Sequence, residues 1–99
     1  MITELVKLNL LEAATDEQLI VKSDLLINDF MKKQEGFIDA ELIKEVDKNV
    51  WTFIYHFVNI EKLKAIGEAM RKSKEFAEFI TLITPGSLSV TIYHQLSKW

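Results

Sequence analysis

The stretch WTFIYHF, from Trp51 to Phe57, is the feature that most restricts how this chain can fold. Every second residue in it is a large aromatic one, and Thr52, Ile54 and His56 stand between the rings. Because successive side chains of a strand point to opposite faces, this alternation predicts a β-strand with one ring-lined face and one largely aliphatic face. Neither face suits water, so we expect a sheet that is covered on both sides.

Other segments complete the predicted set of elements. Period-two alternation predicts strands over residues 2–10, 37–46, 50–58 and 88–96. Thr15 and Gln18 have the spacing of a capping box, which predicts the start of a long helix, and Gly36 suits the end of that helix. Asn59 predicts the start of a second helix, and Ser73 that of a short third one.

The predicted order of elements is strand, helix, strand, strand, helix, strand. This order is typical of the α+β ferredoxin-like fold, βαββαβ, in which a four-stranded antiparallel sheet carries its helices on one face. A length of 99 residues suits a single domain, so we expect one domain over residues 1–99.

The two faces of this sheet predict a partner. We expect the aliphatic face, including Ile54, to pack against the helices and the ring-lined face to point away from them. Several adjacent exposed rings would form a larger apolar patch than a monomer usually tolerates, which predicts a homodimer. The alternative is that the rings only shield a half-exposed sheet. The expected dimer-interface residues are Trp51, Phe53, Tyr55, Phe57 and Tyr93.

Composition excludes several functional classes. The net charge is −3 with both signs interspersed, so no basic surface is available for nucleic acid. The chain has no Cys, which excludes a disulfide framework and a thiolate nucleophile and is compatible with a cytoplasmic location. Glu4 and Lys7 interrupt the first apolar stretch, unlike a signal peptide. The longest stretch without charge, 79–97, is broken by Pro85 and Gly86, so we expect no membrane span.

Two histidines are the candidate residues for chemistry. We expect His56 and His94 on the aliphatic face, between sheet and helices and at opposite ends of the sheet. A neutral imidazole there would serve as a general base for a phenol or enol, which makes His56 the candidate catalytic residue. The structural alternative is a histidine at the edge of the core bonded to a backbone carbonyl. No third ligand is spaced to share a metal with them, so we predict no metal site.

Between Gly36 and Phe79 the chain resembles the antibiotic biosynthesis monooxygenase family of the dimeric α/β barrel superfamily. The resemblance rests on GFIDAELIK, VWTFIYHF, NIEKL and EFAEF, which describe a strand opened by Gly-Phe, an aromatic strand and the helix starts that follow. It implies a homodimer and an apolar cleft between sheet and helices. Members include cofactor-free oxygenases of quinol-like or anthrone-like aromatics. Asn9 is then the counterpart of an asparagine that some members use near the reacting oxygen.

The resemblance leaves two functions open. One is a cofactor-independent monooxygenase of a small aromatic or quinol compound, with Asn9, His56 and His94 as ligand-binding residues and no cofactor. The other is a non-catalytic small-molecule-binding or regulatory dimer on the same scaffold. Many members carry a Glu-x-Trp pair where this chain has Tyr55 and Phe57, and a helical histidine where it has Ile66. The haem-degrading members use a tryptophan and a histidine that residues 59–83 lack.

Overall fold

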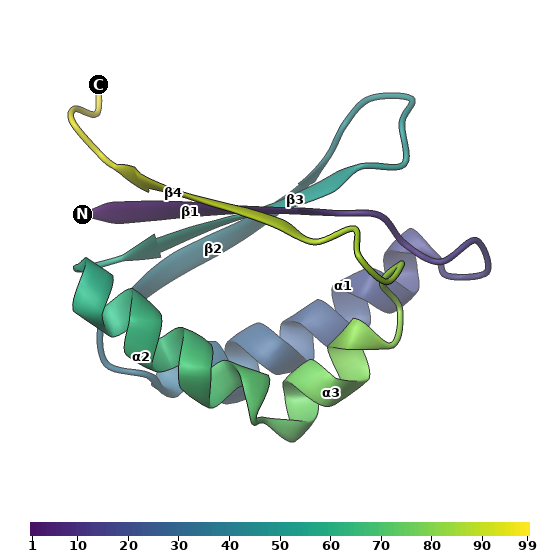
Figure 1. The fold of residues 1–99 in the computed structure, drawn as a ribbon, viewed down its shortest axis with the longest axis horizontal. Coiled ribbons are helices and arrows are strands. Elements are labelled where there is room, and N and C mark those ends of the chain that lie inside the picture. The colour runs from purple at the N-terminus through teal and green to yellow at the C-terminus, as the bar shows by residue number, and fades with distance from the viewer.

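A single antiparallel sheet carries all of the helices on one of its faces in the computed structural model, which describes residues 1–99 (Figure 1). The strands are β1 (Ile2–Leu8), β2 (Phe37–Lys44), β3 (Trp51–Phe57) and β4 (Ser89–His94). Their spatial order is β2-β3-β1-β4, with every neighbouring pair antiparallel. The predicted α+β ferredoxin-like arrangement is confirmed.

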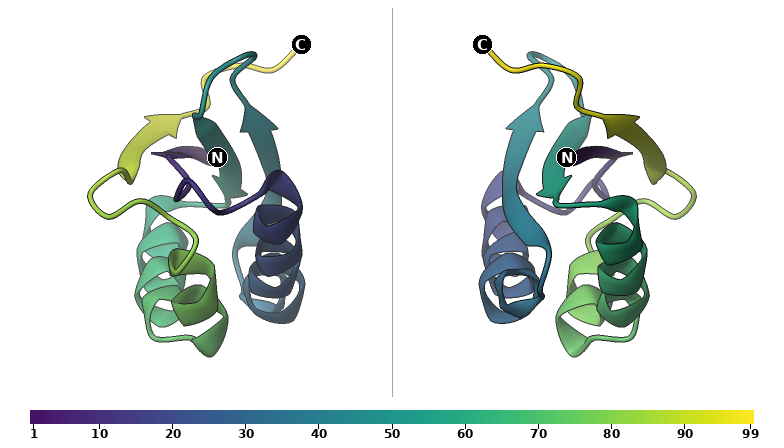
Figure 2. Two further views of the ribbon diagram at one scale, coloured as in Figure 1. Left: turned by 90° about the vertical axis from the view of Figure 1, so that its right-hand side faces the viewer. Right: turned by 90° about the vertical axis from the view of Figure 1, so that its left-hand side faces the viewer.

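The helices form two rows beneath the sheet (Figure 2). One row is α1 (Asp16–Asp24), which continues as a π-helical segment η1 (Leu25–Phe30) and a 3-10 turn η2 (Met31–Lys33). The other row is α2 (Ile60–Arg71) followed by α3 (Lys74–Ile80). None of these helices combines the length and the apolar character that crossing a membrane requires.

The helix starts lie where the capping residues predict. The Thr15 hydroxyl accepts a hydrogen bond from the Gln18 amide at 3.2 Å, and the Gln18 side chain accepts one from the Thr15 amide at 2.9 Å. Asn59 and Ser73 cap α2 and α3 in the same way, through bonds from the amides of Lys62 and Phe76. Each cap satisfies a backbone donor that would otherwise have no partner.

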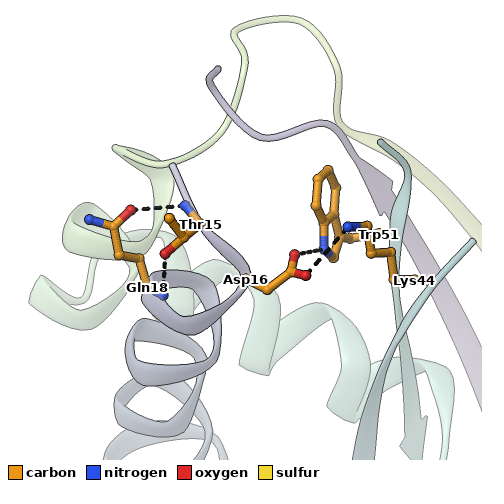
Figure 3. A network of polar contacts seen from close by, with 5 residues as sticks. All are labelled: Thr15, Asp16, Gln18, Lys44 and Trp51. Carbon is orange, nitrogen blue, oxygen red and sulfur yellow. Dashed lines mark hydrogen bonds and ion pairs between the residues drawn. The ribbon is translucent and has the colours of Figure 1, made fainter. Parts of the chain in front are cut away.

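Asp16, the first residue of α1, links this helix to the sheet through polar contacts (Figure 3). Its carboxylate accepts a hydrogen bond from Trp51 Nε1 at 2.8 Å and lies 3.3 Å from Lys44 Nζ. The Lys44 ammonium also lies 4.8 Å from the centre of the Trp51 ring, within cation–π range. These contacts join the start of α1 to the end of β2 and the start of β3.

The sequence-based assignment of the β3 faces is wrong. Its four rings point toward the helices, and at most 6% of the surface of any of these residues is exposed in the single chain. Phe53 stacks on Tyr55 with ring centres 5.5 Å apart and meets the edge of Phe79 of α3 at 5.6 Å. Trp51, Phe53, Tyr55 and Phe57 therefore belong to the core of one chain and leave no ring surface for a partner.

Strand pairing shows why β1 and β4 were assigned correctly and β3 was not. The start of β2 is a second error, because a bulge after Phe37 turns its ring toward Phe57 on the helix-covered face and leaves Ile38 exposed. Ile2 pairs with Phe57, Val6 with Phe53 and Leu8 with Trp51, so the aliphatic residues of β1 and the rings of β3 share the helix-covered face. Rings and aliphatic side chains are both apolar, and a shift of one residue exchanges the two faces of β3. The open face consequently carries Ile54 and His56, together with the expected Tyr93.

Replacing Phe53 by Ala should lower the free energy of unfolding by about 3–5 kcal/mol, because the ring has no exposed surface and its removal leaves a cavity between the sheet and the helices. Urea unfolding followed by circular dichroism measures this change. Val46→Ala is the matched control, since Val46 is 83% exposed and its truncation should change stability by less than about 0.5 kcal/mol. Similar losses for the two variants would contradict the burial of the ring row.

Candidate active site

A cavity of about 220 Å³ lies between the sheet and the helices, in the position where the sequence predicts an apolar cleft. Thirteen of its 16 lining residues are hydrophobic, so it favours an apolar ligand. Its walls come from β1, β3 and β4 above, α2 and α3 on one side, and Leu26 and Met31 of the first helical row on the other. Exposed Val90 of β4 and exposed Arg71 of α2 mark the side on which it meets solvent.

Glu4 places a carboxylate among these apolar walls. It lies in the middle of β1, between Ile2 and Val6 on the helix-covered face, directly opposite Tyr55 of β3 and Ile92 of β4. Burial raises the pKa of Glu4 above its ordinary value, because an apolar environment disfavours the charged form, and the positive charge of Arg71 offsets part of this rise. Glu4 takes part in none of the ion pairs of the chain.

Tyr55 supplies a hydroxyl beside this carboxylate. Burial raises the pKa of the Tyr55 phenol, and the negative charge of Glu4 raises it further. The phenol therefore stays neutral under ordinary conditions and acts as a hydrogen-bond donor. Its hydroxyl makes no hydrogen bond within the chain. It is not fully buried, however, because Ser23 Oγ is the only fully buried side-chain polar atom that lacks a hydrogen-bond partner. The Tyr55 hydroxyl is available to a molecule in the cavity.

Arg71 completes the set of titratable groups that line the cavity. It stands at the end of α2, eight residues after Leu63 and four after Gly67, so the three share one helix face. A Cβ atom on Gly67 would lie 3.4 Å from Arg71 Nη1, which shows that the guanidinium folds back over the glycine. Glycine inside a helix costs roughly 0.5–1 kcal/mol relative to alanine. A Cβ atom here would make only an ordinary van der Waals contact with the guanidinium.

His56 does not lie in this cavity. It is on the open face of the sheet, where its Nδ1 atom lies 2.6 Å from Asp39 Oδ1 of the adjacent strand β2. The prediction that His56 lies between sheet and helices is wrong, because the β3 side chains on that face are the four aromatic rings. The imidazole therefore has an ion-pairing neighbour but no enclosed space for a ligand.

Asn9 and His94 also lie apart from the cavity and from each other. The Asn9 side chain donates to the carbonyl of Asn49 in the β2–β3 hairpin, and its backbone carbonyl accepts from Thr84. His94 is exposed at the end of β4, opposite Ile2, while His56 is opposite Thr3. The two histidines thus share one end of the sheet, contrary to expectation, because β3 and β4 both run antiparallel to β1 and so parallel to each other. They point to opposite faces.

Sequence reasoning missed Glu4 and Arg71 as site residues. A usable signal existed for Glu4, since it is a single charge on the otherwise apolar stripe of Ile2, Val6 and Leu8. The signal for Arg71 is weaker, because a basic residue in the last turn of a helix is already favoured by the helix dipole. Its position in line with Gly67 becomes informative only when the face of α2 that meets the sheet is known.

Comparison of the sequence with known proteins gives no assignment. No protein-family model matches the chain, and no curated protein matches it in sequence. Solved structures, in contrast, match over nearly its whole length.

SnoaB from Streptomyces nogalater, described as a cofactor-independent oxygenase, superposes with a TM-score of 0.74 at 14% identity, covering 98% of this chain and 94% of SnoaB. An antibiotic biosynthesis monooxygenase, so named provisionally, from Caulobacter crescentus gives 0.75 at 13% identity, with 97% and 90% covered. A protein from Shewanella oneidensis gives 0.68 at 25% identity, with 95% and 89% covered. The chain has the fold of these proteins.

The resemblance seen in the sequence is thereby confirmed at the level of the fold. Tyr55, Phe57 and Ile66, which the resemblance marks as departures from the family pattern, all line the cavity.

Replacing Glu4 by Gln should stabilise the protein at neutral pH, because the raised pKa means that folding disfavours the carboxylate. The folded state binds the Glu4 proton more tightly than the unfolded state does. The contribution of Glu4 to the free energy of unfolding is therefore fully present below pH 4.5, its ordinary pKa, and is lost as the pH rises through the pKa of the folded state. Thermal unfolding of both proteins across this range measures the effect. The difference in Tm should be smallest at low pH and grow as the pH rises.

The exposed Glu12 supplies the control. Glu12→Gln should follow the wild-type curve at every pH. A Glu4→Gln difference that does not change with pH would contradict the desolvation of the Glu4 carboxylate.

Proposed function

We propose that the chain binds a small aromatic compound in this cavity and oxygenates it without a cofactor. The observation that carries the proposal is an apolar, ring-lined cavity that contains an unpaired carboxylate and a free phenol hydroxyl. The fold shared with SnoaB, itself described as a cofactor-independent oxygenase, supports the reaction class. We also propose a cytoplasmic location, which the absence of Cys supports.

In this reaction the ligand itself supplies the electrons. An electron-rich aromatic CH₂ group and one O₂ molecule give a C=O group and one water molecule, so no separate reductant is needed. The walls of Phe53, Phe76 and Phe79 exclude water and orient the aromatic plane. The Tyr55 hydroxyl donates a hydrogen bond to the oxygen on which negative charge develops.

Tyr55→Phe should lower oxygenation of an anthrone probe by about 10- to 100-fold, since a hydrogen bond to a charged group is worth about 1.5–3 kcal/mol. Oxygen uptake and mass-spectrometric detection of the ketone product measure the reaction. Tyr93→Phe on the open face is the matched control and should retain wild-type activity. Equal oxygenation rates of the wild type, Tyr55→Phe and Tyr93→Phe would show that the Tyr55 hydroxyl takes no part in the reaction.

The same assay tests the sequence-based assignment of His56. Loss of activity in His56→Ala, with the oligomeric state and the fold unchanged, would return the catalytic role to the open face. Full activity of that variant would leave the cavity as the reaction site.

A non-catalytic ligand-binding protein is the second candidate. The location of Tyr55, Phe57 and Ile66 favours this function. The resemblance marks these three positions as departures from the family pattern, and all three line the cavity. Saturable binding of the aromatic probe without oxygen uptake would establish this function in place of the oxygenase.

We further propose that a second copy of the chain covers the open face of the sheet. Tyr93 of β4 and Ile43 of β2 are 47% and 44% exposed there, and Leu5 and Ile54 occupy its centre. The resemblance to the dimeric α/β barrel superfamily supports a homodimer. The proposed interface thus centres on Leu5 and Ile54. Polar residues such as His56 surround this centre, and the four rings of β3 are not part of it.

Ile54→Lys should convert such a dimer to a monomer at micromolar concentration, because it places a charged side chain that must be desolvated at the centre of the interface. Native mass spectrometry and light scattering give the oligomeric state. Ile20→Lys places the same charge on exposed α1 and should leave the dimer intact. A wild-type monomer, or a dimer that tolerates Ile54→Lys, would contradict this interface.

A further inference from the structure

A long groove separates the edge strand β2 from the first helical row, outside the cavity already described. Its volume is about 610 Å³. The residues that line it include Ile20, Ser23 and Ile27 of the helical row and Ile38, Ala40 and Leu42 of β2. Phe53 lines both the groove and the cavity. A side chain docked in the groove would therefore lie one ring away from the ligand space.

Ser23 leaves an unused hydrogen-bonding group in this groove. The residue is only 4% exposed, and its Oγ atom is fully buried without a hydrogen-bond partner. A buried hydroxyl that has lost its water and gained no partner destabilises the fold. A molecule in the groove that brings a donor or an acceptor to Ser23 removes this cost.

The outer edge of β2 offers unpaired backbone groups beside the groove. β2 stands at one end of the sheet, so only one of its sides is paired. The Glu45 amide donates to the Val50 carbonyl at 2.9 Å, and hydrogen-bonded pairs alternate along an antiparallel ladder. Glu41 therefore bonds to β3, whereas the backbone N–H and C=O groups of Ala40 and Leu42 point outward. Such an edge can accept one more extended strand.

Residues 95–99 form a segment whose apolar side chains have no contact surface of their own. Leu96 is 94% exposed and Trp99 is fully exposed. Lys98 takes part in none of the ion pairs of the chain. The segment leaves β4 on the side of the sheet away from the helices (Figures 1 and 2). Because an aromatic side chain buries about 150–250 Å² in an interface, Trp99 is suited to anchor one.

The alternation of this segment matches that of β2 in one antiparallel register. The register pairs Leu96 with Ile43, Ser97 with Leu42, Lys98 with Glu41 and Trp99 with Ala40. Residues directly opposite each other on antiparallel strands share a face. Lys98 then meets a carboxylate that belongs to no ion pair, and Leu96 packs on a partly exposed isoleucine. Trp99 enters the groove at Ala40, the smallest side chain on that side of β2.

We infer that residues 96–99 of a second copy add to β2 as an antiparallel strand, with the Trp99 ring in the groove beside Ser23. The indole N–H is a donor that the free Ser23 hydroxyl can accept. This inference rests on the proposed self-association of the chain and adds a second contact to it.

The same chain cannot supply this segment to its own groove. β4 and β2 are opposite edges of the sheet, three strand spacings or about 14 Å apart. The five residues after His94 reach about 17 Å when fully extended. Crossing the sheet would leave about one residue to lie along β2, so the occupant has to come from another copy.

Disulfide formation between two copies tests the register, because the chain has no Cys of its own. Glu41 and Lys98 would form a non-hydrogen-bonded pair with Cα atoms about 4.5 Å apart, within the range of a disulfide. Protein carrying Glu41→Cys, mixed with protein carrying Lys98→Cys, should give a mixed disulfide under mild oxidation. Glu45→Cys is the matched control, since it lies about 13 Å further along the chain and should not react.

Equal yields of disulfide from Glu41→Cys and Glu45→Cys, or no mixed disulfide at all, would overturn the inference. So would an intrachain disulfide in a chain that carries both Glu41→Cys and Lys98→Cys, because the occupant would then be the same copy.

A peptide separates the groove from the proposed dimer of open faces. The variant with both Ile54→Lys and Trp99→Ala lacks the centre of that dimer and its own Trp99 ring. A peptide of residues 94–99 should shift the NMR signals of the Ala40 and Leu42 amides in this variant, and the peptide with Trp99→Ala should not. Absence of these shifts at millimolar peptide would overturn the groove as the docking site. Shifts in a chain that stays dimeric with Ile54→Lys would instead refute the open-face contact and leave the groove contact standing.

Discussion

The packing of the β3 rings against the helices is the constraint on which the rest of the molecule depends. β3 is an inner strand, and Phe53 at its middle has no exposed surface. Rings of this size hold the helices away from the sheet, and smaller neighbours such as Ala40 and Glu4 occupy the adjacent strands. The space that the rings leave beside β1 and β4 is the cavity. Stability and ligand binding therefore depend on the same side chains, because Phe53, Tyr55 and Phe57 are both core and cavity wall.

The order and type of the elements were predictable because they depend on local signals. Capping residues such as Thr15 and Asn59, and alternation within each strand, act over a few residues and do not require knowledge of the packing. The face of β3 was not predictable in the same way, since rings and aliphatic residues are both apolar. The polar character of Thr52 and His56 was the available clue. Sorting the strand by polarity, and not by ring content, would have turned the rings toward the helices.

The candidate site was harder to predict than the fold because its residues are brought together from three separate elements. Glu4 was detectable as an isolated charge on an apolar strand face, whereas Arg71 looked like an ordinary helix-terminal cation. The histidines drew attention because of their chemistry, yet strand direction and register place them on opposite faces of the sheet and outside the cavity. Residue type alone thus favoured the wrong candidates, and the shape of the packed molecule identified the others.

The π-helical segment η1 has a consequence for the outer wall of the cavity. Residues five apart lie on different faces of an α-helix, but the wider turn of η1 aligns them, and the Met31 amide bonds to the Leu26 carbonyl. Leu26 and Met31 therefore face the cavity together. If the same residues were wound as an ordinary α-helix, Met31 would turn away from Leu26 and out of the cavity wall. The outer wall of the ligand space therefore depends on how one helical turn is wound, and not only on which side chains line the cavity.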